Sequence, residues 1–376
     1  MNRILLGGAA AFALMSGAAF AGGIERANQS IGILFEEGNY AEAGIQLTRP
    51  SVSGRDLAQY GGTATGDVAD NYNALSFGYK HEFGNGLSAA LIVDQPYGAD
   101  IAYTPTAEGG SVMLGGTRAS VSATAITGIL RYKMENNIGV HAGVTLSRAD
   151  GAVTLDGMAY GPVAGYNATM ETSNATGWLA GVSWERPDIA ARVALTYYSD
   201  RTHDFDTTER MGAAVIGQGV TSVTTPRAIN LDFQTGVAAD TLVFGQIRWV
   251  KWSEFEINPT VFSSPAMAGA GLVEMENSTT YTLGVGRRFT DNWSGSASIS
   301  YEPKGNELVS PLAPTNGRLG LTLAGIYTQD NLKITTGINY TRLGNAFPET
   351  GTPDVARAEM TGNNALSVGM RVGYRF

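Results

Sequence analysis

The sequence predicts an all-β fold: a 14-stranded antiparallel transmembrane β-barrel over residues 40–376, with a short N-terminal hatch inside its lumen. Three observations predict this fold. The C-terminal segment alternates between apolar and polar residues, the N-terminal segment is typical of exported proteins, and short turns alternate with longer polar connections. Cysteine is absent, so disulfide bonds cannot stabilise the exported chain, and we expect closure of the sheet to do so.

The C-terminal segment 366–376 has a period of two residues. Its apolar face consists of Leu366, Val368, Met370, Val372, Tyr374 and Phe376. Its other face consists of Ser367, Gly369, Arg371, Gly373 and Arg375. This period indicates a strand with one face in an apolar environment. The strand ends on an aromatic residue, as strands of outer-membrane barrels commonly do, and we expect the barrel-assembly machinery to recognise Phe376.

Residues 1–21 are predicted to be a secretory signal peptide. Arg3 supplies the positive charge, residues 4–20 supply the apolar stretch, and Ala19-Phe20-Ala21 is a small-x-small cleavage site. The alternative is an uncleaved helical anchor, but glycines and a serine interrupt the apolar stretch and no basic flank follows it. The mature chain is therefore expected to begin near Gly22, outside the cytoplasm.

The connections along the chain sort by length. We expect fourteen strands, at 40–53, 72–83, 86–103, 117–134, 137–150, 173–186, 189–204, 222–237, 240–256, 273–289, 292–304, 315–329, 331–345 and 364–376. Tight turns rich in Asn, Asp, Gly or Pro fall at 83–86, 135–137, 186–188, 238–240, 290–292 and 329–331. Long polar connections are expected at 104–116, 151–172, 205–221, 257–272 and 346–363. Outer-membrane barrels have short periplasmic turns and long outer loops, so an even strand count places both termini in the periplasm.

The alternation within the strands predicts a polar lumen. It is clearest at 137–150, 292–304 and 331–345, where one face is apolar and the other is polar or small. We therefore expect little apolar core inside the barrel. Aromatic residues near strand ends are expected to form interfacial girdles, and they are Trp178, Trp184, Tyr197, Tyr198, Trp249, Trp252, Trp293 and Tyr301.

Neither an enzyme nor a nucleic-acid-binding protein is predicted. The 34 acidic residues exceed the 25 basic residues, for a net charge of −9, which argues against a nucleic-acid partner. His81, His141 and His203 fall in separate strands. His141 faces the lumen and could meet a serine there, so an outer-membrane lipase is an alternative. No Gly-x-Ser-x-Gly elbow or zinc-type histidine pair occurs, and we expect no catalytic site, metal or cofactor.

The third strand contains a segment that does not suit a continuous strand. Gln95, Pro96, Tyr97 and Gly98 lie in the middle of 86–103. Proline cannot donate to the ladder and glycine weakens a strand, so a kink or bulge is expected here. In lipid, other groups must then satisfy the freed backbone atoms. The alternative is that Pro96 lies just past the membrane, where the strand enters its loop.

Residues 22–39 precede the first strand and are predicted to form the hatch. The segment contains Asn28, Gln29, Ser30 and Phe35. It is too apolar for a free periplasmic tail and too irregular for a strand. A barrel of about fourteen strands is wide enough to hold a plug. The alternative is a short disordered tail.

Together these features resemble the FadL/TodX family of outer-membrane transporters for hydrophobic compounds. The segments that carry the resemblance are 28–30, 35–42, 95–98, 225–231, 249–255 and 374–376. The resemblance implies a monomeric barrel that captures a substrate, such as a long-chain fatty acid, among its outer loops. It implies that the hatch then moves, and that the substrate leaves sideways at the kink formed by Gln95, Pro96, Tyr97 and Gly98. The Asn-Pro-Ala triplet often seen in the family's hatch is absent.

The substrate remains open at this point. A fatty-acid carboxylate requires a cation inside the barrel, and the alternation directs Arg192 and Lys333 inward, with Arg248 a further candidate. The family also includes carriers of aromatic hydrocarbons. A general diffusion porin is a third alternative, but porins more often have sixteen or more strands and a charged constriction.

Overall fold

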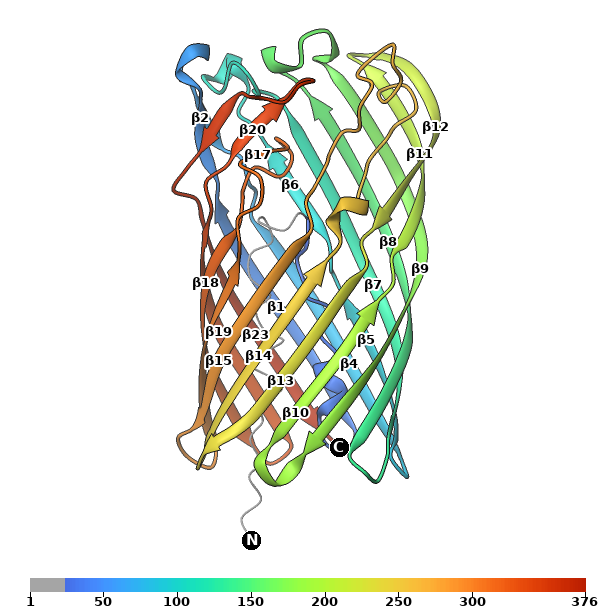
Figure 1. Ribbon diagram of the computed structural model, residues 1–376, viewed down its shortest axis with the longest axis vertical. Coiled ribbons are helices and arrows are strands. Elements are labelled where there is room, and N and C mark those ends of the chain that lie inside the picture. The colour runs from blue at the N-terminus through green and yellow to red at the C-terminus, as the bar shows by residue number, and fades with distance from the viewer. Residues whose placement is uncertain (1–23) are drawn as a thin grey trace.

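The computed structural model describes residues 24–376 and shows a closed antiparallel barrel of fourteen strands (Figure 1). The barrel closes where β1 (Tyr40–Ser51) pairs with both β4 (Tyr72–Gly84) and β23 (Asn364–Arg375). The predicted signal peptide, residues 1–21, lies outside the described residues. Within residues 24–376, no helix is long and apolar enough to cross a membrane.

Eleven of the fourteen positions in the wall hold one continuous strand, and three hold an interrupted strand. The remaining continuous strands are β7 (Arg118–Lys133), β8 (Ile138–Leu155), β9 (Tyr166–Arg186), β14 (Thr241–Val250), β15 (Ser278–Arg288), β16 (Trp293–Glu302), β18 (Arg318–Gln329) and β19 (Leu332–Leu343). The interrupted strands are β5 (Leu87–Asp94) with β6 (Gly98–Ala102), β10 (Ala191–Tyr198) with β11 (Arg201–Met211), and β12 (Ala214–Thr225) with β13 (Ala228–Ala238).

Short elements fold over the outer end of the barrel. The outer strands are β2 (Ser53–Asp56), β3 (Ala64–Asp67), β17 (Leu308–Val309), β20 (Phe347–Thr350), β21 (Val355–Ala356) and β22 (Ala358–Met360). The 3-10 turns are η1 (Gly32–Phe35), η2 (Ala58–Tyr60), η3 (Thr106–Glu108), η4 (Met158–Val163), η5 (Pro187–Ile189) and η6 (Trp252–Glu254), of which η1 lies in the lumen and η5 in a short turn.

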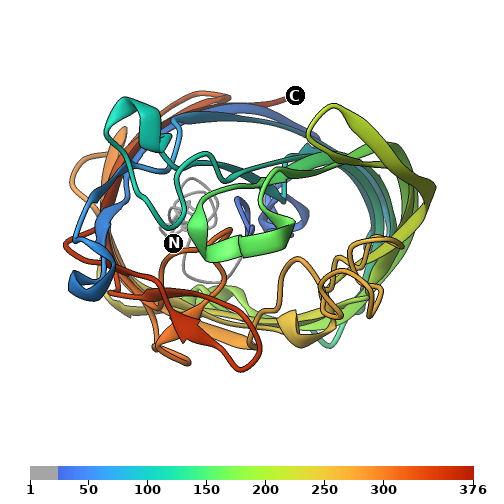
Figure 2. The same ribbon diagram turned by 90° about the horizontal axis from the view of Figure 1, so that it is seen from above.

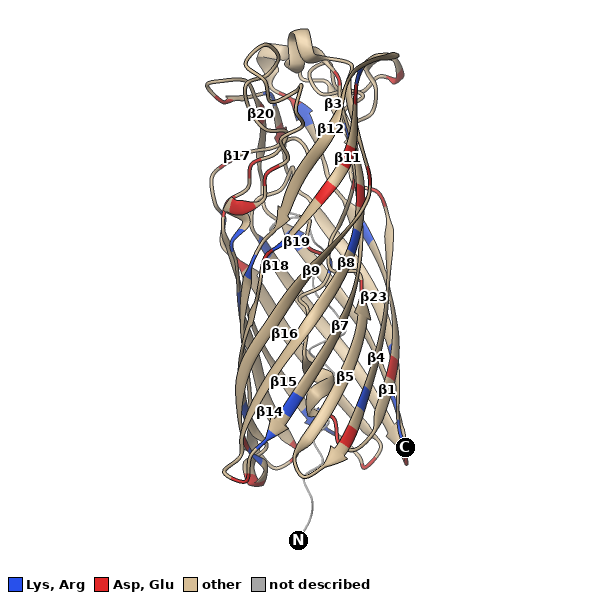
Figure 3. Ribbon diagram, turned by 90° about the vertical axis from the view of Figure 1, so that its right-hand side faces the viewer, with Lys and Arg blue, Asp and Glu red and all other residues tan. Residues whose placement is uncertain are grey.

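The faces of the strands confirm the predicted alternation. On β19, Ile338 and Tyr340 are exposed on the outside, whereas Thr335 and Asn339 are each only 1% exposed inside the barrel. The terminal strand follows the same rule, with Val368 exposed and Ser367 buried. Charged residues gather toward both ends of the barrel in Figure 3, leaving a band between them free of charge in that view. This arrangement fits a wall whose outer surface contacts lipid.

Exposed aromatic residues border the apolar band on both sides. At the end with the short turns they are Phe83, Tyr132, Trp184, Phe289, Trp293, Tyr374 and Phe376, and nearer the outer loops they are Trp178, Tyr281, Tyr301 and Tyr340. At a rise of about 3.3 Å per residue and a tilt of about 40°, the girdles on β16 are roughly 20 Å apart. The expected girdle positions of Tyr198 and Trp252 are wrong, because both side chains are buried.

The six predicted tight turns are confirmed, but two predicted loops are largely strand. β8 and β9 extend into 151–172, and β11 and β12 fill nearly all of 205–221, joined by a two-residue turn. The predicted strict alternation of short and long connections is therefore wrong at this hairpin. Beyond the membrane both faces of a strand can be polar, so composition there no longer distinguishes a strand from a loop.

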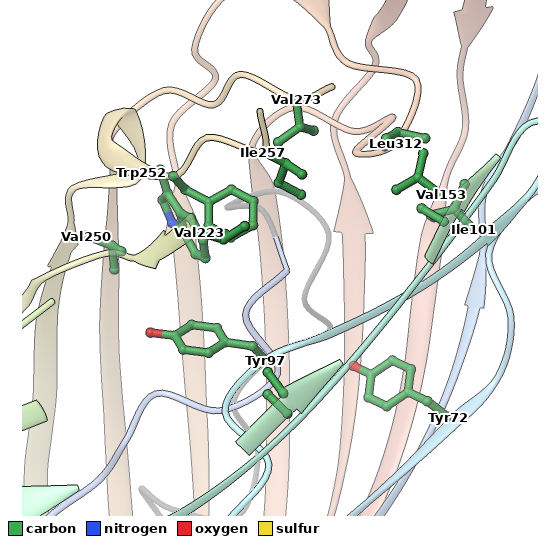
Figure 4. Packing of buried hydrophobic residues seen from close by; sticks show 14 of the residues in the cluster. Tyr72, Tyr97, Ile101, Val153, Val223, Val250, Trp252, Ile257, Val273 and Leu312 are labelled. Atoms are coloured by element: carbon green, nitrogen blue, oxygen red, sulfur yellow. The ribbon is translucent and has the colours of Figure 1, made fainter. Parts of the chain in front are cut away.

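The outer half of the lumen is apolar, contrary to the expectation of little core. Strand residues such as Ile101, Val153 and Val223 pack with Trp252 and Leu312 from the inward-folded loops (Figure 4). The sequence patterns did not identify this core because part of it comes from irregular segments.

A charge on the lipid-facing side should destabilise the barrel in a depth-dependent way. Leu323 of β18 is exposed about midway between the girdles, and Leu323→Arg should lower the unfolding free energy in vesicles by about 2–4 kcal/mol. The matched control is Asn174→Arg, at an exposed position of β9 beyond Trp178, with an expected effect of about 0–1 kcal/mol. Equal effects at the two positions in urea titrations would contradict the assigned membrane band.

Candidate substrate path and lateral exit

The third strand of the barrel is broken between β5 and β6. Asp94 pairs with Ala125 of β7, and Gly98 pairs with Ser122. Residues 95–97 therefore span only two residues of β7, which is a β-bulge, and the kink or bulge predicted from Pro96 is confirmed. The extra residue reverses the faces of the strand, so that the even-numbered Ser88 is buried before the break and the odd-numbered Ile101 is buried after it.

On its other side the break interrupts the ladder to β4. That ladder ends at the Phe77–Val93 pair, and the Leu75 N–H donates instead to the side-chain Oε1 of Gln95 at 3.0 Å. The alternative that Pro96 lies in a loop is wrong, because β6 continues to pair with β7. Exposed residues beside the break change from apolar Leu75 to polar Asn73. The break therefore lies in the wall, at the outer edge of the apolar band.

Backbone groups of the N-terminal segment, residues 24–39, satisfy the broken strand. The Arg26 N–H donates to the Pro96 carbonyl at 2.8 Å, and the Gly98 N–H donates to the Ile24 carbonyl at 2.8 Å. Glu25 and Tyr97 form an antiparallel bridge between these bonds. The segment thus acts as a short extra strand along the break, supplying partners that lipid cannot.

The Arg26 side chain occupies the break itself. Its Nη2 donates to Asp100 Oδ2 at 2.7 Å, and its guanidinium carbon lies 4.2 Å from the centroid of the Tyr72 ring. A Cβ atom on Gly98 would lie 2.5 Å from that carbon. Gly98 is therefore needed so that the arginine can reach Asp100.

Of the four predicted hatch residues, Asn28, Gln29 and Phe35 contact the inner wall, whereas the bond of Ser30 lies within the segment. The segment lies within the ring of strands in Figure 2. Asn28 Nδ2 donates to Gln246 at 3.0 Å, and the Gln29 carbonyl accepts a bond from the Tyr198 hydroxyl. The Ser30 hydroxyl accepts from the Gly32 N–H at 3.1 Å.

All three predicted lumen cations contact the N-terminal segment; Arg248 and Lys333 are buried, and Arg192 is partly buried. Arg248 Nε donates to Glu25 at 3.0 Å, and Lys333 Nζ donates to Glu36 at 2.8 Å. Arg192 stacks 4.1 Å from the centroid of Phe35 and donates to Gln234. The inward direction of these cations is confirmed, but carboxylates of the segment already neutralise two of them.

Two further arginines near the break were not identified from the sequence. Arg201 is 5% exposed and its Nη2 donates to the Tyr97 hydroxyl at 3.3 Å. Arg26 was not singled out either, although it is one of the few charges in an otherwise apolar segment. The acidic Asp100, two residues after Gly98 in a strand expected to face lipid, could have indicated that a basic residue such as Arg26 lies beside it.

An aromatic chain leads from the outer loops to the break. The Phe255 and Trp252 rings meet edge to face with centroids 5.9 Å apart. Trp252 meets Tyr97 in the same way at 6.1 Å, and Figure 4 shows these two residues. These residues connect the apolar core of the outer half with the broken strand. Trp252 and Phe255 belong to the 249–255 segment, which is one of the segments that resemble the FadL/TodX family.

The space beside the break is small in this conformation. A cavity of ≈ 90 Å³ lies between the N-terminal segment and the wall, and Arg26, Ser30, Asp94 and Gln95 are among its lining residues. Pockets for drug-sized ligands are usually about 300–1,000 Å³. The cavity can hold several waters but not a long aliphatic chain.

His141 lies inside the barrel, as expected, but it does not bond to a serine as the lipase alternative requires. His141 lies 3.0 Å from Thr196 rather than near a serine, and His203 instead lies 3.2 Å from the Ser147 hydroxyl. Within residues 24–376, no group of three or more acidic or histidine side chains is placed to hold a metal.

One carboxyl group in the outer loops has a shifted pKa. Burial raises the pKa of Glu349 in β20 to about 7, and the nearby charges of Asp354 and Glu274 act in the same direction. This side chain is therefore only partly ionised near neutral pH, which weakens the repulsion that an approaching anion would meet there.

Breaking the Arg248–Glu25 pair should loosen the N-terminal segment. Arg248→Met leaves a largely buried carboxylate without its partner, which costs about 3–5 kcal/mol. Hydrogen exchange at the Arg26 and Gly98 amides should become at least about a hundredfold faster. Adding Glu25→Gln removes the unpaired carboxylate and should restore most of the protection of these amides against hydrogen exchange. Unchanged exchange in Arg248→Met would show that this pair does not hold the segment.

Comparisons with known proteins agree with this geometry. The family model described as outer membrane protein transport protein (OMPP1/FadL/TodX) matches residues 7–376. A Pseudomonas aeruginosa FadL homologue is similar in fold, with a TM-score of 0.71 at 14% identity, covering 92% of each chain. The Pseudomonas putida toluene transporter TodX has a TM-score of 0.62 at 13% identity, covering 91% of each chain. The Ralstonia pickettii toluene transporter TbuX has a TM-score of 0.63 at 10% identity, covering 91% of this chain and 90% of that one.

No curated protein sequence matches the chain. The structural likenesses establish the fold, and the family model spans nearly the whole sequence. The chain therefore belongs to the OMPP1/FadL/TodX family, whose members are non-enzymatic channels that carry hydrophobic compounds across the bacterial outer membrane.

Proposed function

We propose that the protein carries long-chain fatty acids passively across the outer membrane and releases them sideways at the break in the third strand. The single observation that carries the proposal is the aromatic chain from Phe255 through Trp252 to Tyr97, because it joins the outer-loop core to the break. An apolar solute moving along this chain gains roughly 25 cal/mol for each Å² of apolar surface removed from water.

Capture takes place in the outer loops. The loop residues Phe255, Ile257 and Leu312 are buried in the same apolar core as Trp252. A solute that inserts among these side chains leaves water before it reaches the lumen. A water-filled pore would offer no such gain.

The N-terminal segment acts as the hatch. The cavity beside it is too small for a fatty acid, so the segment must move before the chain can pass. The segment buries Ile31, Ile33 and Leu34 in the apolar cluster of the lumen. Its polar ties to the wall are chiefly the pairs of Glu25 with Arg248 and of Glu36 with Lys333. Such ties can be exchanged for bonds to water or substrate without unfolding the barrel.

Release takes place between the second and third strands. Backbone bonds of Ile24, Arg26 and Ala27 to Gly98 and Pro96 close the ladder at the break. Because the break lies at the outer edge of the apolar band, a solute leaving there enters the outer leaflet.

Aromatic hydrocarbons are the second candidate substrate. Two similar structures are described as toluene transporters, which supports this alternative. The buried Arg201, Arg248 and Lys333 and the partly buried Arg192 favour a substrate with a carboxylate, because a cation attracts a carboxylate more strongly than it attracts the ring of a neutral hydrocarbon. A general porin is disfavoured by the segment that occupies the lumen.

We also propose that the barrel-assembly machinery recognises Phe376. The ring is 57% exposed at the end with the short turns and stacks on Tyr79 with centroids 6.0 Å apart. Its exposure leaves it accessible to a partner.

The proposed function predicts restored uptake in cells. Gram-negative cells that lack their own fatty-acid channel should take up labelled oleate when they express this protein. Replacing Gln95-Pro96-Tyr97 by Thr-Val removes the bulge and should reduce uptake at least about tenfold, because the ladder to β4 can then continue. Pro226→Thr, at the interruption between β12 and β13, is the matched control and should transport normally.

Surface labelling of the outer loops verifies insertion of each variant. If the straightened barrel carries oleate as fast as the parent chain, release does not occur at the break. If a correctly inserted parent chain carries toluene and not oleate, the second candidate substrate replaces the first.

A further inference from the structure

Arg26 reaches through the wall of the barrel. The arginine belongs to the lumenal segment, yet its partner Asp100 lies on the outward face of β6, between the buried Ala99 and Ile101. Asp100 is also opposite the exposed Ser120 of β7. The Arg26–Asp100 pair therefore connects the inside of the barrel with its outside at the break.

The position of Gly98 also indicates that the Arg26 side chain passes through the wall. Gly98 has the same parity as Asp100 after the bulge, so a side chain there would point outward. A Cβ atom at this position would collide with Arg26 Nη1 and Cζ, each 2.5 Å away. The guanidinium thus occupies the space that an outward side chain would fill.

The guanidinium is only partly engaged. Within residues 24–376 its side chain makes one hydrogen bond, from Nη2 to Asp100, and stacks on Tyr72. Arginine carries five N–H donors in a planar fork that suits a carboxylate. The cavity beside Arg26 gives the other donors access to a ligand from the lumen side.

We propose that Arg26 is a carboxylate-binding site at the lateral exit, where the carboxylate of the leaving amphiphile replaces Asp100 as the partner of the guanidinium. The proposal rests on the proposed function and names the residue that binds the carboxylate of its substrate. The aliphatic tail enters the lipid while the carboxylate stays with Arg26, at the polar edge of the apolar band.

The exchange distinguishes charged from neutral substrates. The Asp100 side chain is 40% exposed and that of Arg26 is 11% exposed. When the pair separates, water solvates Asp100 readily, whereas Arg26 needs a new anion. A carboxylate supplies that anion, and a neutral hydrocarbon must open the exit without a replacement partner.

The test compares uptake of labelled oleate with uptake of labelled oleyl alcohol, which has the same chain and no charge. Arg26→Met should lower the initial rate for oleate at least fivefold and leave the rate for oleyl alcohol equal or higher. Arg26→Lys should recover part of the oleate rate. Asp100→Asn removes the competing carboxylate and should raise the oleate rate.

Arg227→Met is the matched control. Arg227, at the interruption between β12 and β13, makes a two-bond ion pair with Glu254 of η6 and has no contact with Arg26 or Asp100, so its loss should change neither rate. Surface labelling verifies equal insertion of all variants.

Three results would overturn the inference. If Arg26→Met lowers both rates by the same factor, the arginine only shapes the wall. If it lowers neither, the exit does not use the charge. If the parent chain carries oleyl alcohol and not oleate, the carboxylate site is refuted while lateral transport of apolar compounds stands. Uptake of neither compound by the inserted parent chain refutes the proposed function itself.

Discussion

The rest of the structure depends on the absence of water from the membrane interior. Backbone N–H and C=O groups there must be paired within the protein, which is why the strands close into a ring with β1 joined to both β4 and β23. The break at Pro96 is tolerated because backbone atoms of Ile24 and Arg26 bond to the broken strand. The same backbone bonds therefore close the wall at the break and fix the position of the N-terminal segment.

The same constraint accounts for the charges in the lumen. A cation facing a narrow lumen needs an anion, and Arg248 and Lys333 find theirs in Glu25 and Glu36. The two carboxylates hold the segment against the wall and neutralise the cations. Apolar contacts of the buried Ile31, Ile33 and Leu34 hold the segment as well.

Much of the fold could be predicted because lipid imposes a strict period on each strand. The turns, the faces of strands such as β19 and the bulge at Pro96 all follow from local patterns. Where the wall leaves the membrane that constraint ends, and the hairpin of β11 and β12 was taken for a loop. The site was harder to predict, since the contacts of Arg26 with Asp100 and of Tyr97 with Trp252 join residues distant in sequence.

The central claim is that the N-terminal segment must leave the wall before a substrate can exit. The chain has no cysteine, so Glu25→Cys with Tyr97→Cys can form a single disulfide that locks the segment to the broken strand. The two residues form an antiparallel bridge between flanking backbone bonds, and the Cα atoms of such a pair are about 4.5 Å apart, within the range of a disulfide. Oxidation should stop oleate uptake and reduction should restore it, while the paired serine variant responds to neither treatment. Full uptake by the oxidised, cross-linked protein would contradict the claim.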